Sequence, residues 1–106
     1  MVTYEDFKKL DLRIAKIIEA QRIKASDKLI KLQIDLGNEQ RQIIAGIGKV
    51  YTPEELIGKL IVIVSNLEPK KLLGEESNGM LLAASNEEEI SLLMPDKEIP
   101  PGSIVK

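Results

Sequence analysis

The chain has 106 residues, of which 43% are hydrophobic and 30% are charged, and its formal net charge is −2. This length fits one compact domain, residues 1–106, and this mixture is typical of a folded rather than a disordered protein. No apolar run approaches the roughly 20 residues of a membrane-spanning helix, and the charged N-terminus lacks the apolar core of a signal peptide. We therefore expect a cytoplasmic protein with no membrane partner.

Two short helices are predicted from their capping residues. Thr3 as an N-cap, with Glu5 and Asp6 in the first turn after it, is typical of a helix N-terminus, so a short helix is expected over residues 4–9. The Thr-Pro-Glu-Glu sequence within residues 51–56 predicts a helix of one or two turns that ends at Gly58. Neither helix is long enough to connect two parallel strands.

The first three strands are predicted from the alternation of apolar and polar residues. Residues 11–23 begin by alternating, and the doublet Ile17-Ile18 breaks the phase, which indicates a β-bulge or a strong bend. Residues 30–36 alternate throughout, and the turn Gly37-Asn38 leads into a further strand over residues 41–45. Two glycines that follow this strand mark a bend or a close backbone approach.

The second half of the chain contains shorter strands. Residues 59–66 include five consecutive apolar residues, which predicts a strand buried on both faces. Residues 68–78 are interpreted as a polar loop. Strands are expected over residues 79–85 and 89–94, with short extended pieces near the C-terminus.

Five or six short strands with two minor helices favour an all-β fold. The five-stranded antiparallel OB-fold barrel, with short N-terminal and connecting helices, suits this pattern best, and a β-sandwich is the alternative.

The charged residues are unevenly distributed. Residues 8–49 carry ten basic and five acidic residues, whereas residues 72–106 carry two basic and seven acidic residues. Because salt screens distant charges beyond roughly 8–10 Å, a local basic excess can hold a phosphate backbone on an acidic protein. These side chains could equally be the solvated faces of half-buried strands, and charge alone favours that alternative.

Cysteine and histidine are both absent. Without them the chain can form no disulfide, no zinc–cysteine site and no Ser-His-Asp triad, and it lacks the usual neutral-pH general base. Clusters of glutamate leave a carboxylate-based hydrolase as a remote alternative, because such acids are usually solvated. We expect no enzymatic activity, no catalytic residues, no metal site and no cofactor.

Six sequence blocks, in this order and spacing, match one family. They are residues 11–17 (DLRIAKI), 26–32 (SDKLIKL), 41–47 (RQIIAGI), 51–59 (YTPEELIGK), 66–70 (NLEPK) and 77–84 (SNGMLLAA). The chain resembles the tRNA-binding domain found at the C-terminus of methionyl-tRNA synthetases, in free-standing tRNA-binding proteins and in EMAP-II-type cytokine precursors. The resemblance runs from about Tyr4 to the C-terminus.

The resemblance implies an OB-fold module that binds tRNA by its shape, near the outside corner of the L, and catalyses nothing. It also implies a homodimer. A chain that begins with its own Met resembles the separately encoded beta chain of a methionyl-tRNA synthetase, whose catalytic chain is then a further partner, or the free-standing protein. A protein-binding chaperone of the same family is the alternative function.

Seven residues are expected to bind tRNA. Lysine and arginine would contact phosphates, Asn and Ser would supply neutral hydrogen bonds, and Met would offer an adaptable apolar surface. They are Lys28, Lys31, Arg41, Asn66, Lys70, Ser77 and Met80. The alternatives are a solvated hairpin face for the cations, local backbone bonds for Asn66 and Ser77, and a core position for Met80.

Two further expectations concern affinity and assembly. Family members commonly carry an aliphatic residue after the glycine that corresponds to Gly74, whereas this chain has Glu75 and Glu76, which should repel phosphate. We therefore expect a weak accessory binder. The helix around Phe7 and the segment 99–105 are the candidate dimer surfaces.

Overall fold

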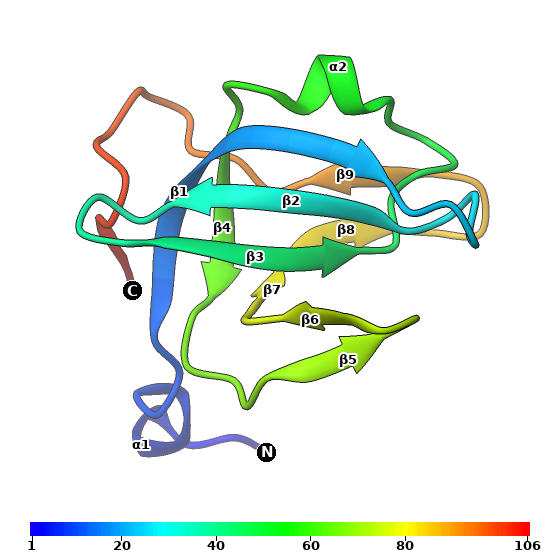
Figure 1. Ribbon diagram of the computed structural model, residues 1–106. Coiled ribbons are helices and arrows are strands. Elements are labelled where there is room, and N and C mark those ends of the chain that lie inside the picture. Colours follow the sequence, from blue (N-terminus) through cyan, green and yellow to red (C-terminus); the bar gives the residue numbers. More distant parts are fainter.

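The computed structural model describes residues 1–106. A curled antiparallel sheet forms a half-barrel, consistent with an OB-like barrel (Figure 1). Its strands in spatial order are β3 (Gln40–Ala45), β2 (Ile30–Asp35), β1 (Leu12–Arg22), β4 (Leu60–Val64) and β7 (Met80–Leu81), and β10 (Ile104–Val105) also pairs with β1. The expected all-β class is confirmed.

Both predicted helices are present. In α1 (Tyr4–Phe7), the Thr3 hydroxyl accepts a hydrogen bond from the Asp6 amide at 3.1 Å. In α2 (Pro53–Leu56), the Glu55 carboxylate accepts one from the Thr52 amide at 2.9 Å. The first helix ends two residues earlier than expected. No helix in the chain has the length and apolar character needed to cross a membrane.

The phase break in β1 allows this one strand to serve two halves of the sheet. Residues 12–16 pair with β4, and residues 16–22 pair with β2. The register shifts between Ile17 and Glu19, which confirms the predicted bulge. Because a bulge increases strand twist, β1 can change direction without a loop and curl the sheet.

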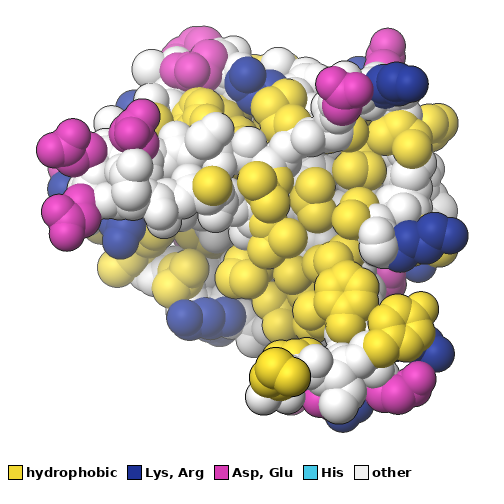
Figure 2. Space-filling model, turned by 180° about the vertical axis from the view of Figure 1, so that it is seen from behind, with side chains coloured by type: hydrophobic (Ala, Val, Ile, Leu, Met, Phe, Trp, Pro, Cys, Tyr) yellow, Lys and Arg dark blue, Asp and Glu magenta, His cyan; other side chains and the backbone are white.

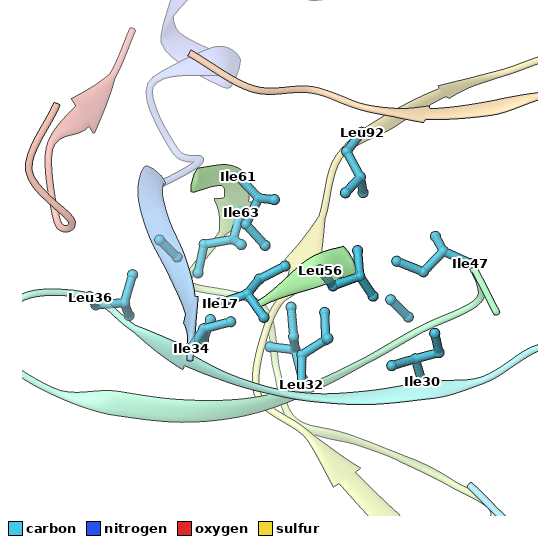
Figure 3. Close-up of a cluster of buried hydrophobic side chains, with 13 residues drawn as sticks. Ile17, Ile30, Leu32, Ile34, Leu36, Ile47, Leu56, Ile61, Ile63 and Leu92 are labelled. Atoms are coloured by element: carbon cyan, nitrogen blue, oxygen red, sulfur yellow. The ribbon is translucent and has the colours of Figure 1, made fainter. Parts of the chain in front are cut away.

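The core is aliphatic and lies inside the curled sheet (Figure 3). Its thirteen buried residues are Ala15, Ile17, Ile30, Leu32, Ile34, Leu36, Ile43, Ala45, Ile47, Leu56, Ile61, Ile63 and Leu92. Leu56 brings α2 over the core, and its side chain is fully buried. Strand β4 is buried on both faces as predicted, because Val62 and Val64, which alternate with the core residues of this strand, are also buried.

The expectation of an irregular loop over residues 68–78 is wrong. Strands β5 (Lys70–Leu72) and β6 (Glu75–Ser77) form a hairpin there. Its turn consists of Leu73 and Gly74, whose φ angles are both positive, at 51° and 81°. Two positive φ angles are typical of a type I′ hairpin turn, which is usually recognised in a sequence by Asn-Gly or Asp-Gly. Leucine at the first turn position hid this signal.

The strand expected over residues 79–85 is divided. Leu82 separates β7 from β8 (Ala83–Ser85), although its amide still bonds to the Val62 carbonyl at 2.9 Å. Strand β8 pairs with β9 (Ile90–Leu92), which is shorter than the expected 89–94. The division allows the chain to leave the main sheet and form a separate hairpin.

Gly102 should be intolerant of substitution because its turn lies directly against the end of β2. A Cβ atom at Gly102, where φ is +91°, would lie 2.4 Å from the Leu36 carbonyl oxygen, whereas one at Gly74, where φ is +81°, would meet nothing within 4 Å. We expect Gly102→Ala to lower the free energy of unfolding by about 2–4 kcal/mol and Gly74→Ala by about 1 kcal/mol. Urea unfolding would measure both, and equal losses would contradict the role of this contact.

Candidate nucleic-acid interface

The outer face of β2 and β3 is mostly polar, because every apolar residue of these two strands except Ile44 points into the core. Lys31 and Gln33 on β2 lie outside, opposite Ile44 and Gln42 on β3. The Gln33 side-chain amide donates a hydrogen bond to the Gln42 side-chain carbonyl at 3.0 Å. The face therefore presents amides and one ammonium group side by side.

Basic residues gather where this face ends. We call the set Arg22, Lys24, Lys28, Lys31 and Lys49 the cationic end; Asp27 lies among them. The connection between β1 and β2 packs closely on the glycines after β3, since a Cβ at Gly48 would lie 2.8 Å from the Asp27 carbonyl oxygen. The Arg22 guanidinium donates to the Gly48 carbonyl at 2.9 Å. The close approach predicted at these glycines is confirmed, and it brings Lys49 beside the first loop.

Most of the cationic end has no anionic partner. Lys24, Lys28 and Lys49 are exposed and form no ion pair within 4.0 Å. The Lys28 side chain runs along Gly46, where a Cβ would lie 3.1 Å from its Cε. These ammonium groups are free to meet an anion from outside.

The β5–β6 hairpin is joined to the free edge of β3 through Ser77. The Ser77 hydroxyl accepts a hydrogen bond from the Ile44 amide at 2.9 Å and donates one to the Gly79 carbonyl at 3.1 Å. The next residue, Asn78, donates its amide to the Gln42 carbonyl at 2.8 Å. Ser77 is buried, so its hydroxyl is committed to bonds within the protein.

The hairpin also brings charges beside the outer face. Lys70 lies opposite Ser77 in the hairpin, and both Lys70 and its neighbour Lys71 are exposed. Lys31 Nζ lies 3.4 Å from Glu75 Oε1, the only ion pair of the cationic end. The hairpin therefore adds two free lysines, the paired carboxylate of Glu75 and the unpaired carboxylate of Glu76, which lies opposite Lys71.

Arg41 does not join Lys28 and Lys31. It alternates with the outward Gln42, so it emerges on the core side of β3, at the strand end remote from Lys31. Its guanidinium donates to the Ser65 carbonyl and pairs with Glu39. Its side chain thus fixes the chain after β4 to the start of β3.

A polar hollow of about 180 Å³ lies beside Arg41. Arg13 and Asp11 also line it, and Arg13 Nε lies 2.7 Å from Asp11 Oδ1. This hydrogen bond, aided by the guanidinium charge, lowers the pKa of Asp11 below its ordinary value. Two arginines and two carboxylates balance each other here, so the hollow offers no net charge to a ligand.

Asn66 and Met80 also lie apart from the cationic end. The Asn66 side chain accepts a hydrogen bond from the Asp11 amide at 2.9 Å and donates one to the Lys9 carbonyl at 2.7 Å, which holds the segment after α1. Met80 pairs with Val64 on the sheet face away from the core, and 48% of its surface is exposed.

The structure thus brings Lys28 and Lys31 to the same end of β2, with Lys70 on the adjoining hairpin. Sequence reasoning did not select Arg22, Lys24 or Lys49. The glycines at positions 46 and 48 were the available signal for Lys49, because they imply that another part of the chain approaches closely. They do not indicate which segment that is.

A larger hollow lies elsewhere, between β1, β4 and the loop over residues 94–101, with a volume of about 720 Å³. Lys16, Lys59 and Lys97 line it together with Asp96 and Glu98. Its mixed charge distinguishes it from the cationic end.

Replacing Ser77 should cost stability because its hydroxyl is the partner of a buried amide. We expect Ser77→Ala to lower the free energy of unfolding by about 1–3 kcal/mol. The exposed Ser85 on β8 provides a matched control, and Ser85→Ala should change the same quantity by less than about 0.5 kcal/mol. Chemical denaturation would compare the two, and similar losses would show that the hydroxyl bridge contributes little.

Comparison with known proteins gives consistent results. Residues 12–104 match the family described as "Putative tRNA binding domain". The chain is 59% identical over 102 residues to a methionine–tRNA ligase of Caldanaerobacter subterraneus subsp. tengcongensis, covering 96% of this chain and 16% of the ligase. The chain therefore spans about one sixth of the length of that relative.

Two solved structures superpose over the whole chain. The MetRS-related protein from Pyrococcus horikoshii has a TM-score of 0.94 and 40% identity, with 98% of that chain covered. The chaperone CsaA from Bacillus anthracis has a TM-score of 0.94 and 39% identity, with 99% of that chain covered.

Proposed function

Because the chain belongs to the tRNA-binding domain family, we propose that it binds tRNA as a non-catalytic module with an OB fold. The observation that carries this proposal is the cationic end, where Lys24, Lys28 and Lys49 are exposed and free of ion pairs on a protein of net charge −2. Phosphate contacts supply most of the affinity of such interfaces.

The manner of binding that we propose is backbone and shape contact. The chain has only three aromatic residues. Tyr4 and Phe7 are the first and last residues of α1, and the Tyr51 hydroxyl accepts a hydrogen bond from the Leu92 amide at 3.1 Å. Since stacking on exposed rings dominates the binding of single strands, their absence from the cationic end favours a folded RNA whose phosphates match the surface.

The seven candidate residues receive different roles in this proposal. Lys28, Lys31 and Lys70 contact phosphates. Arg41, Asn66 and Ser77 hold the connecting segments in place through bonds within the protein, and they affect tRNA through that structure. Met80 belongs to the apolar rear surface described below.

The biological role that we propose is assistance to a methionyl-tRNA synthetase in the cytoplasm. Curated relatives of 52–59% identity are methionine–tRNA ligases, of which the chain spans 14–16%. A weak second site raises the local concentration of tRNA without any contact at the catalytic centre. No step of aminoacylation is therefore assigned to this chain.

The tRNA-binding surface can be tested by neutralising two of its lysines. We expect Lys28→Gln/Lys31→Gln to raise the Kd for total tRNA by about tenfold at low salt, because two phosphate contacts are lost. Lys59→Gln/Lys97→Gln removes the same charge beside the 94–101 loop and should raise the Kd by less than about twofold. Filter binding or fluorescence anisotropy would measure both, and equal effects would refute the assigned surface.

We also propose that the module is a homodimer. Figure 2 shows a broad hydrophobic patch on the rear face that continues down to α1. Tyr4 and Phe7 of α1 are exposed apolar residues, and Met80 of β7 and Val105 of β10 lie in one cross-strand row with Leu12 and Val64 on the sheet face away from the core. Large exposed apolar patches mark interaction sites, and a second copy would cover this one symmetrically.

Charged residues placed in this patch should prevent dimerisation. We expect Phe7→Glu/Val105→Glu to sediment as a monomer at micromolar concentration while the unchanged protein sediments as a dimer. Leu73→Glu, at an exposed apolar residue on the β5–β6 turn, is the control and should remain dimeric. A monomeric parent protein would refute the homodimer.

A protein-binding chaperone is the second candidate, since the chaperone CsaA from Bacillus anthracis superposes on the whole chain. The same apolar patch would then hold unfolded polypeptide. Suppression of aggregation of a denatured test protein, combined with no retention of tRNA, would favour this function over the first.

A further inference from the structure

One carboxylate of the protein already forms an ion pair with a lysine of the proposed RNA-binding surface. Lys31 is the sole member of the cationic end with an ion pair, and its Nζ lies 3.4 Å from Glu75 Oε1. The two side chains are 22% and 36% exposed, so the pair is more sheltered than the free lysines nearby. A phosphate that approaches Lys31 therefore meets a competing anion.

The position of this carboxylate is fixed by the attachment of the hairpin. Glu75 precedes the buried Ser77 by two residues in β6, and Ser77 is bonded to the edge of β3. A second bond runs from the Gln42 side-chain amide to the Glu76 carbonyl at 2.9 Å. These bonds hold the Glu75 backbone beside β2 and β3, so its carboxylate can return to Lys31 whenever an external anion leaves.

The neighbouring glutamate differs in one respect. Glu76 is exposed and its carboxylate forms no ion pair within 4.0 Å, because successive side chains of a strand point to opposite faces. The two residues carry the same charge on the same strand. The chain thus contains its own comparison between a carboxylate that contacts Lys31 and one that does not.

We propose that Glu75 is a built-in competitor for RNA phosphate at Lys31. In the free protein the Glu75 carboxylate pairs with the ammonium group, and bound RNA displaces it. Displacement costs the internal ion pair and leaves a carboxylate close to the incoming phosphate, and both effects weaken binding. RNA that makes many other phosphate contacts tolerates this loss, whereas RNA that makes few does not. The inference rests on the proposed tRNA binding and identifies the residue that limits its affinity.

The test compares two isosteric substitutions. Glu75→Gln and Glu76→Gln each raise the net charge by one, but only the first frees Lys31. We expect Glu75→Gln to lower the Kd for total tRNA by about three- to fivefold at moderate salt, and Glu76→Gln by less than about twofold. The plot of log Kd against log salt concentration should steepen by about 0.9 for Glu75→Gln alone, as expected for one additional phosphate contact.

A double-mutant cycle shows whether the effect passes through Lys31. In a Lys31→Gln background, Glu75→Gln should tighten binding no more than Glu76→Gln does. Equal effects of the two glutamate substitutions in the parent protein, or an undiminished effect of Glu75→Gln without Lys31, would overturn the inference and leave tRNA binding standing. A parent protein and variants that all fail to bind tRNA would overturn the proposed function and the inference together.

Discussion

The bond between the Ser77 hydroxyl and the Ile44 amide is the interaction on which the arrangement of this surface depends. Strand β3 is the last strand of the curled sheet, and its outer edge would otherwise present unpaired amides. Ser77 satisfies one of them, and the Asn78 amide bonds to the Gln42 carbonyl next to it. The half-barrel is thereby closed by a short hairpin instead of a further long strand, and that hairpin carries Lys70, Lys71 and Glu75 to the side of the cationic end.

Much of this fold follows from the sequence alone. Strict alternation identified β2, and five consecutive apolar residues identified β4, because burial on one or both faces leaves these patterns directly in the chain. The bulge in β1 was visible as the doublet Ile17-Ile18. The β5–β6 hairpin was not visible, since Leu73 occupies a turn position that usually carries Asn or Asp, and its strands are too short and too charged to alternate clearly.

The candidate site was less accessible to sequence reasoning. Lys28 and Lys31 could be selected because they flank the start of a clear strand. Arg41 has the same charge and lies on the paired strand, but it alternates with the outward-facing Gln42 and so points to the core side of β3. There it donates a hydrogen bond to the Ser65 carbonyl and pairs with Glu39. Whether Asn66 and Ser77 face outward or bond to distant backbone depends on contacts more than thirty residues away in sequence, which no local pattern records.

The position of the chain ends in Figure 1 has a consequence for architecture. In Figure 1 the N-terminus lies at the bottom beside α1 and the C-terminus at the left, whereas the connection between β1 and β2 lies at the right. A neighbouring polypeptide fused at either end would therefore start at a distance from Lys24 and Lys28. The fold can therefore be attached to a larger enzyme through either its N-terminus or its C-terminus, while the cationic end stays accessible to a macromolecule as bulky as a nucleic acid.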